Sequence, residues 1–303
     1  MKRALKWTAA VVLVGILAAG VLFWQRPVEV YQAAAEAGMV LEGASSRETT
    51  VEGMRVHYYV MGPEDGRPVV LVHGLGGRAE DWKNLAPYLT AAGFRVYIPD
   101  LPGYGQSAKP ADFSYSVRDE AGVVVGFLDE MGLKQMNLGG WSMGGWIAQL
   151  VAAEHPERVK RLMLFDSAGL YARPTWDTAV FTPENAAQVN ELNALLTPNA
   201  QSVPGFVARD IVRVSNRDGW VIQRAMAAML TGKDTTDAIL PRIAMPVLIV
   251  WGQKDEITPL QQGETMRRLI PQSELEVIPG CGHLAPRQCT MAIGPQVAAF
   301  LQH

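Results

Sequence analysis

Short apolar runs recur along this chain at intervals that leave room for helices between them. Six of these runs are compact and rich in apolar residues, at residues 69–72, 95–98, 135–138, 161–165, 247–251 and 275–278. Segments of helical length separate several of them, at residues 116–131, 144–154 and 260–269. Strands buried on both faces that alternate with helices are typical of parallel sheets. The pattern therefore predicts an α/β fold with a mostly parallel central sheet flanked by helices.

An early hairpin and a later insertion interrupt this rhythm. Residues 49–60 alternate in strand fashion around Gly53, which predicts two antiparallel strands joined by a turn. Between residues 171 and 239 no strong strand pattern occurs, and helical stretches take its place, at residues 185–196, 206–214 and 221–230. We expect a core formed by residues 47–170 and 240–303, with residues 171–239 inserted as a helical cap, or lid.

The apolar side chains of this lid leave two interpretations open. They are Phe181, Leu195, Leu196, Phe206, Trp220, Met226, Met229 and Leu230. Most are expected to pack the lid on the core, and some would line an apolar pocket if the lid covers a site.

The N-terminus has the charge pattern of a membrane anchor. Three positive charges come first, at Lys2, Arg3 and Lys6. The uncharged stretch that follows, residues 7–25, is about 19 residues long, which is enough for a helix to cross a bilayer. Because only Arg26 follows closely, we expect the N-terminus to stay in the cytoplasm and the rest to be exported. The chain would then have a transmembrane anchor at residues 1–27 and a juxtamembrane helix and linker at residues 28–46, in the cytoplasmic membrane with its main domain on the periplasmic side.

Other interpretations of the N-terminus stay open. Ala18 and Gly20 have the spacing of a signal-peptide cleavage site, and a buried core helix is a further alternative. The apolar run continues past this site to Trp24, which favours a retained anchor over cleavage. Gly15 and Ala19 form a small-xxx-small pair, so a homodimer through the N-terminal helix is also possible.

Composition narrows the classes of function. The chain has 303 residues, of which 49% are hydrophobic and 19% are charged, and its formal net charge is -3. No basic stripe is present, so we expect no nucleic-acid partner. No Cys/His cluster has zinc-binding spacing, and no GxxxxGK[ST] phosphate loop occurs. Cys281 and Cys289 are the only cysteines, and an exported domain permits a disulfide between them without requiring one.

The sharpest local motif is Gly-Trp-Ser-Met-Gly at residues 140–144. It follows an apolar run and precedes a helical segment, so it joins a strand to a helix through a tight turn. Such a turn strains the backbone of the serine, and glycines on either side avoid clashes with neighbouring elements. Ser142 is therefore the candidate nucleophile, and the alternative is a glycine-rich turn with an incidental serine.

A serine hydroxyl needs a base, and the base needs a carboxylate that orients it. Of the five histidines, only His283 combines a late position with a Gly-x-Gly loop after a strand-like run. Asp255 also follows an apolar run, and it gives the chain order nucleophile, acid, base. Asp166, which ends another apolar run, is the rival acid.

A glycine-rich loop, His-Gly-Leu-Gly-Gly at residues 73–77, follows the first buried run. Glycines let the backbone approach a small anionic atom closely. We predict the backbone N–H groups of Leu75 and Met143 as the two donors of an oxyanion hole. The alternative is a plain glycine-rich turn.

In their order and spacing, these segments resemble the α/β-hydrolase superfamily from about Arg47 to the end of the chain. The resemblance rests on residues 73–77, 100–107, 140–144, 252–259 and 280–283. With the N-terminal span added, the chain is most similar to membrane-anchored bacterial lipases and phospholipases A with a helical lid. The resemblance implies hydrolysis of acyl esters through an acyl-enzyme, with no metal or organic cofactor. Dehalogenase and epoxide-hydrolase relatives use an aspartate nucleophile, so Ser142 argues against those activities.

We accordingly expect a carboxylic-ester hydrolase of the lipase, esterase or phospholipase A type, acting on an acyl-ester or lipid substrate at the membrane surface. Ser142 would attack the carbonyl, His283 would transfer the proton, and Asp255 would orient the imidazole. A carbon–carbon bond hydrolase with the same triad is the alternative. A non-catalytic, membrane-tethered binding protein on this scaffold is a third interpretation.

Overall fold

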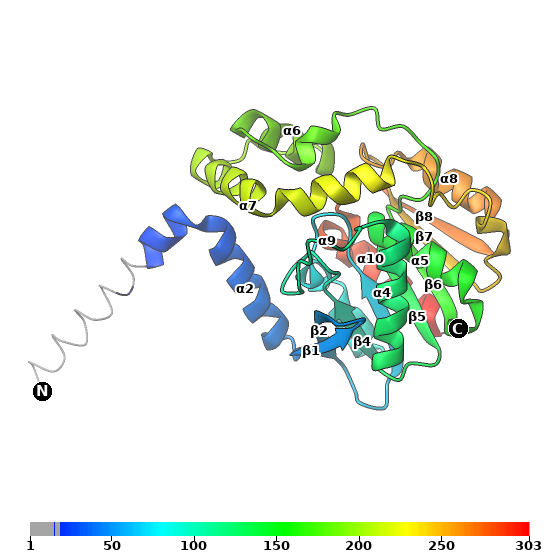
Figure 1. Cartoon of the computed structure of the whole chain (residues 1–303). Helices are drawn as coiled ribbons and strands as arrows, with labels where there is room; N and C mark the ends of the chain where they lie inside the picture. The colour runs from blue at the N-terminus through cyan, green and yellow to red at the C-terminus, as the bar shows by residue number, and fades with distance from the viewer. Residues whose placement is uncertain (1–14, 16–18, 303) are drawn as a thin grey trace, which may run out of the picture.

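The computed structural model describes Gly15 and residues 19–302, and its centre is an eight-stranded sheet (Figure 1). The strands are β1 (Ser45–Val51), β2 (Met54–Met61), β3 (Arg67–Val72), β4 (Phe94–Pro99), β5 (Met136–Trp141), β6 (Val159–Phe165), β7 (Val247–Gly252) and β8 (Ser273–Ile278). Their order across the sheet is β1-β2-β4-β3-β5-β6-β7-β8. β2 pairs antiparallel with β1 and β4, and all other neighbours are parallel. The predicted mostly parallel sheet is confirmed.

Helices cover both faces of the sheet. The described part of the chain contains helices α2 (Pro27–Leu41), α3 (Ala86–Ala91), α4 (Val117–Glu130), α5 (Met143–Glu154), α6 (Ala186–Leu196), α7 (Gly205–Met229), α8 (Leu260–Leu269), α9 (Ala285–Gln288) and α10 (Thr290–Gln302). Of these, α4, α5 and α8 pack on one face of the sheet, and α3 and α10 pack on the other. In β3, Val70 and Val72 belong to the core cluster shared with α4 and α5, whereas Val69 and Leu71 belong to the cluster shared with α3 and α10. Alternate side chains thus face opposite helical layers, which explains why the strands are apolar at successive positions.

The lid lies between β6 and β7 in the chain, and its helices α6 and α7 lie above one end of the sheet (Figure 1). The sequence predicted two helices, at residues 206–214 and 221–230, and this division was wrong, because α7 is one helix of 25 residues. The polar residues 215–218 do not break the helix, since they continue its amphipathic pattern. The buried side of α7 includes Val221 and Ala225.

The predicted membrane span, residues 7–25, lies largely outside the described residues. Residues 19–25 are helical. No helix in the described part of the chain combines the length and apolar character needed to cross a membrane. α2 begins at Pro27, a residue suited to the first helical turn. The linker after α2 is shorter than predicted, because β1 already begins at Ser45, which pairs with Val60 of β2.

Contacts from the N-terminal segment fix the beginning of α7. The Trp24 ring stacks on Phe206 with ring centroids 4.5 Å apart. The backbone N–H of Val28 donates to Asp210 Oδ2 at 2.9 Å, and Arg213 Nε donates to Asp210 Oδ1 at 2.7 Å. The buried Asp210 carboxylate is therefore satisfied by partners from both helices, and α2 and the start of the lid pack as one unit.

Candidate active site

Ser142 lies on a sharp turn between β5 and α5. Its φ and ψ angles are +56° and −120°, and such a strained conformation costs a non-glycine residue about 1–3 kcal/mol. The flanking glycines make the turn possible, since a Cβ at Gly140 would strike the backbone of Gly144, and one at Gly144 would strike the backbone of Val72. The serine is thereby placed at the carboxyl edge of the sheet and at the N-terminus of α5.

His283 and Asp255 converge on Ser142 from the loops that follow β8 and β7. His283 Nε2 lies 2.9 Å from Ser142 Oγ, and His283 Nδ1 lies 2.8 Å from Asp255 Oδ2. Because a carboxylate only accepts, Nδ1 carries the proton and Nε2 is free to accept the serine proton. The backbone N–H groups of Ile257 and Thr258 donate to Asp255 Oδ1 at 2.8 and 3.0 Å and hold it in place. The structure thus brings the three sequence-predicted residues into one hydrogen-bonded chain.

The rival acid, Asp166, is buried nearby and makes no hydrogen bond to the imidazole in the described structure. Its Oδ1 accepts from the backbone N–H of Gly252 at 2.7 Å, and its Oδ2 has no partner among the described residues. Burial, together with the neighbouring charge of Asp255, raises the pKa of Asp166 well above its usual value. Burial and this neighbouring charge therefore favour the protonated form of Asp166, and it is Asp255 that contacts the imidazole.

The predicted oxyanion loop lies against the nucleophile. A Cβ added at Gly74 would come within 3.0 Å of the serine Cβ, so glycine permits this approach. The N–H groups of Leu75 and Met143 have no acceptor among the described residues, which leaves them available to a ligand oxygen. His73 Nδ1 donates to the Gly74 carbonyl at 2.8 Å, and its Nε2 accepts from the Leu101 N–H at 3.0 Å. Burial lowers the pKa of His73, which keeps the ring neutral and Nε2 an acceptor.

Two side chains that position these groups were missed by the sequence analysis. The Thr258 hydroxyl lies 2.8 Å from Asp255 Oδ2 and 3.2 Å from His283 Nδ1. Trp141 Nε1 donates to the His283 carbonyl at 2.8 Å, which ties the end of β5 to the histidine loop. Trp141 had one signal, as a large side chain directly before the serine in a turn otherwise rich in glycine. Thr258 had none that separates it from other threonines.

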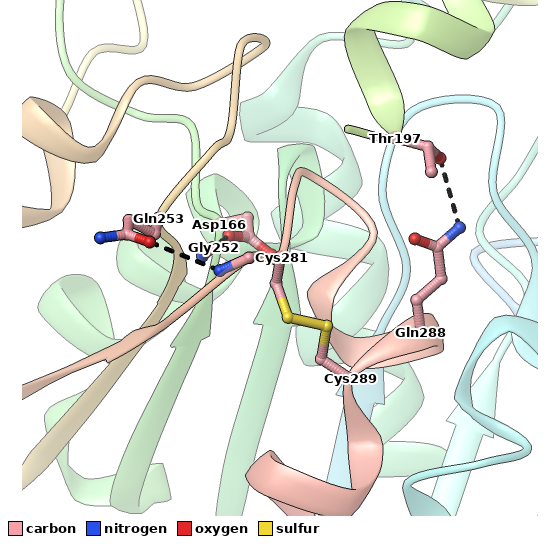
Figure 2. The surroundings of a disulfide bond; sticks show 8 residues. Asp166, Thr197, Gly252, Gln253, Cys281, Gln288 and Cys289 are labelled. Carbon is pink, nitrogen blue, oxygen red and sulfur yellow. Dashed lines mark hydrogen bonds between the residues drawn. A yellow bond between two sulfur atoms is a disulfide. The ribbon is translucent and has the colours of Figure 1, made fainter. Parts of the chain in front are cut away.

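A disulfide closes the loop that carries His283. Cys281 and Cys289 are bonded, and Figure 2 shows the bridge joining the loop after β8 to the end of α9. The sequence had left this pairing open. The Cys281 carbonyl also accepts from the Lys254 N–H at 2.8 Å. The histidine loop is therefore fixed both to α9 and to the loop that carries Asp255.

An apolar cavity of about 400 Å³ opens beside Ser142. The lid supplies much of its wall, from Trp176, Phe181, Met226, Met229 and Leu230. Other lid side chains only pack, as Trp220 does edge-on against Tyr115. Among the described residues that line the cavity, Arg173 alone is charged, and it is exposed. Such a wall suits an uncharged acyl chain.

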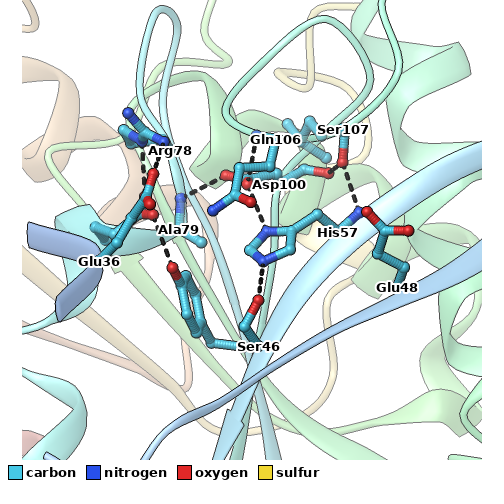
Figure 3. Close-up of polar contacts among 12 residues, drawn as sticks. Glu36, Ser46, Glu48, His57, Arg78, Ala79, Asp100, Gln106 and Ser107 are labelled. Carbon is cyan, nitrogen blue, oxygen red and sulfur yellow. Dashed lines mark hydrogen bonds and ion pairs between the residues drawn. The ribbon is translucent and has the colours of Figure 1, made fainter. Parts of the chain in front are cut away.

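A second Ser–His–Asp chain lies apart from this cavity (Figure 3). His57 Nδ1 lies 2.8 Å from Asp100 Oδ2, and His57 Nε2 lies 2.9 Å from Ser46 Oγ. Asp100 also accepts from the backbone N–H groups of Ala79 and Gln106, at 2.7 and 2.9 Å. Ser46 belongs to the regular strand β1, where no turn aims backbone N–H groups at an oxyanion. This second chain therefore connects β1 and β2 to the loops that contain Ala79, Asp100 and Gln106. It lacks the oxyanion donors that a catalytic serine needs.

Comparisons with known proteins agree on the fold and differ on the reaction. The family model described as "alpha/beta hydrolase fold" matches residues 67–286. A 2-hydroxymuconate semialdehyde hydrolase of Pseudomonas putida is 32% identical over 251 residues, covering 78% of this chain and 87% of that protein. Lipase 1 of Psychrobacter immobilis is 26% identical over 254 residues, covering 78% and 77%. A solved structure described as a membrane phospholipase A has a TM-score of 0.81 at 27% identity, covering 100% of this chain and 98% of the other.

Proposed function

This chain belongs to the α/β-hydrolase fold family, and from that premise we propose that it is a serine hydrolase that cleaves acyl esters of lipids at a membrane surface. The observation that carries the proposal is the hydrogen-bonded chain of Ser142, His283 and Asp255 at the wall of an apolar cavity. Ester hydrolysis needs a nucleophile, a base and a place for the acyl chain, and all three meet here.

The geometry supports a two-step reaction. Ser142 Oγ attacks the ester carbonyl carbon while His283 Nε2 takes the hydroxyl proton, and the N–H groups of Leu75 and Met143 stabilise the oxyanion. Asp255 stabilises the imidazolium, which then protonates the leaving alkoxide, so an alcohol departs and the acyl group stays on Ser142. Water, deprotonated by His283, attacks the acyl-enzyme, and the carboxylic acid is released with the serine restored.

A carbon–carbon bond hydrolase is the second candidate, favoured by the 32% identity to the 2-hydroxymuconate semialdehyde hydrolase. The substrate in that relative's name is an acid. An acid group bound within the apolar cavity would need a fixed cation there. The apolar cavity offers Arg173, which is exposed, and otherwise uncharged walls. The lining therefore favours a neutral acyl chain.

Membrane attachment is the second part of the proposal. The apolar run at residues 7–25 and the positive charges before it support an anchor in the cytoplasmic membrane, with the hydrolase domain on the extracytoplasmic side. At the end of that run, Val21, Leu22, Phe23 and Trp24 are at least half exposed, which suits contact with lipid. Alkaline extraction of membranes should leave the full chain in the pellet, and external protease should cleave its domain. Release into the supernatant would contradict the anchor, and cross-linking of the extracted protein tests the predicted homodimer.

The esterase proposal is tested with the purified full-length protein. Esters of graded acyl length and phospholipids should be hydrolysed by the wild type and by Ser46→Ala, but not by Ser142→Ala. Ser46→Ala is the matched control, because it removes an identical hydroxyl from the other Ser–His–Asp chain. If the protein removes the absorbance of a dienol substrate of the kind formed by ring cleavage, and hydrolyses no ester, the carbon–carbon bond hydrolase is favoured. Activity confined to short soluble esters would contradict the lipid part of the proposal.

A further inference from the structure

A second cavity, of about 350 Å³, borders the oxyanion loop. No described residue lines both cavities, since Leu75 lines the apolar cavity and Gly76 lines the second. α7 passes both of them, with Val221 at the second cavity and Met226 at the apolar one. The two cavities therefore border the same loop, the one predicted to hold the carbonyl oxygen of the substrate.

Glycines form part of the wall of this second cavity. Gly103 and Gly105 have φ angles of +89° and +48°, which glycine adopts without strain. A Cβ at Gly105 would clash with the Asp100 carboxylate, and a Cβ at Gly103 would come within 2.6 Å of Val221 Cγ1. Glycine is therefore needed at both positions, because neighbouring side chains already occupy the space that a Cβ would take, and this part of the wall is backbone.

Three cations and one carboxylate line the cavity, namely Arg78, Lys109, Arg217 and Asp218. Arg217 Nη2 donates to Asp218 at 2.7 Å. Arg78 donates to Glu80 at 2.7 Å and to Glu36 at 3.2 Å, and neither of these carboxylates lines the cavity. The arginines are thus held in place by their carboxylates, and the charge of the lining itself is positive.

Lys109 is the cation of this cavity with no ionic partner. Its Nζ donates to the Gly103 carbonyl at 2.9 Å, and no carboxylate lies within 4.0 Å of it among the described residues. Although the residue as a whole is exposed, desolvation lowers the pKa of the Lys109 ammonium. The carboxylates of Asp218 and Asp100 offset part of this effect from beyond ion-pair distance, and an anion bound beside Lys109 would provide a direct ionic partner.

We propose that this second cavity binds the phosphate of an anionic lipid headgroup, in the same substrate whose acyl ester reaches Ser142. The inference rests on the proposed ester hydrolysis. Arg78 precedes the 3-10 helix η1 (Ala79–Trp82), Lys109 lies in the segment after β4, and Arg217 lies on α7. Donors from three separate elements suit the tetrahedral oxygens of a phosphate better than a planar carboxylate. With an acyl chain in the apolar cavity, the alcohol side of the ester would carry the phosphate to the other side of the loop.

The test compares two substrates that differ in the headgroup alone. Detergent-dispersed phosphatidylglycerol and diacylglycerol with the same acyl chains are offered to the full-length wild type and to Lys109→Gln. We expect kcat/KM for phosphatidylglycerol to fall about tenfold, as for a lost charge-assisted hydrogen bond, and kcat/KM for diacylglycerol to stay within about twofold. Lys109→Arg should retain most of the phosphatidylglycerol activity. The matched control is Lys134→Gln, which removes the same charge from an exposed turn before β5 and should change neither rate.

Inorganic phosphate distinguishes a headgroup site from a site for the free anion. It should compete with phosphatidylglycerol in the wild type and lose that effect in Lys109→Gln. If phosphate competes but Lys109→Gln cleaves phosphatidylglycerol at the wild-type rate, the cavity binds free phosphate and the headgroup proposal is overturned. An equal loss on both substrates also overturns it. Failure of the wild type on both substrates overturns the lipid part of the proposed function, which is a separate result.

Discussion

Replacing Asp166 by asparagine separates the roles of the two buried aspartates near the histidine loop. The Asp166 side chain accepts one hydrogen bond, from the Gly252 N–H, and its Oδ2 is without a partner among the described residues. Asparagine retains an acceptor oxygen in nearly the same shape, and since the raised pKa of Asp166 keeps it neutral, no folded-state charge is lost. Near pH 4 and below, we expect the free energy of unfolding to change by less than about 1 kcal/mol.

The same substitution at Asp255 is expected to be severe. Asp255 Oδ2 lies 2.8 Å from His283 Nδ1, and an amide there favours the wrong tautomer of the ring. A comparable change in a Ser–His–Asp triad lowers kcat about 10⁴-fold. For Asp166→Asn we expect kcat to stay within about threefold of wild type, a difference of less than 1 kcal/mol in barrier height. Ester hydrolysis by both variants, normalised by active-site titration, measures the contrast.

The stability of Asp166→Asn should also diverge from wild type with pH. An acid whose pKa is raised by folding binds its proton more tightly in the folded state, so the wild type loses stability as pH rises from the unfolded pKa of about 3.9 toward the folded pKa. Asparagine has no such loss. The variant should therefore gain about 1.4 kcal/mol over wild type per pH unit across that range. Denaturant unfolding at several pH values tests this. A 10³-fold loss of kcat, or a relative stability that falls as pH rises, would refute the assignment.

Three further predictions test the rest of the site. Ser142→Ala should abolish labelling by a fluorophosphonate and Ser46→Ala should leave it intact, whereas a labelled Ser46 would show that oxyanion donors are dispensable. Trp141→Phe removes the hydrogen bond to the His283 carbonyl, and steady-state kinetics should show kcat about tenfold lower with KM little changed; an unchanged kcat would mean that the disulfide and the hydrogen bond from Lys254 position the loop without Trp141. Met226→Trp fills part of the apolar cavity and should lower kcat/KM for long-chain esters about tenfold or more while sparing short ones. A uniform loss across chain lengths would exclude this cavity as the acyl site.

The grouping of the site residues could be predicted because each follows an apolar run. The carboxyl ends of parallel strands meet at one edge of a sheet, so Ser142 after β5, Asp255 after β7 and His283 after β8 are brought together whatever their loops do. The choice between Asp166 and Asp255 depended on strand order, which the sequence does not contain. β7 lies beside β8, and β6 does not, so the loop after β7 reaches the histidine.

Other features depend on contacts between distant segments or on weak local signals. The pairing of Ser46 with His57 depends on the register of β1 against β2, and the position of Thr258 depends on how its loop folds back on Asp255. α3 is only six residues long, and α10 contains Pro295, so neither gives a clear helical pattern. The continuity of α7 was missed because a run of polar residues was interpreted as a break rather than as one solvent-facing turn.

The contacts between the N-terminal segment and the beginning of α7 have a consequence for how the lid can move. Trp24 and Val28 hold the first turns of α7 through Phe206 and Asp210. The same rod-like helix continues along the roof of the active site to Met226. Because α7 is one continuous helix, a tilt at its N-terminal end also moves its C-terminal end. The helix cannot move away from the active site independently unless the contacts with Trp24 and Val28 break first. Any displacement of α2 would thereby change the width of the apolar cavity above Ser142.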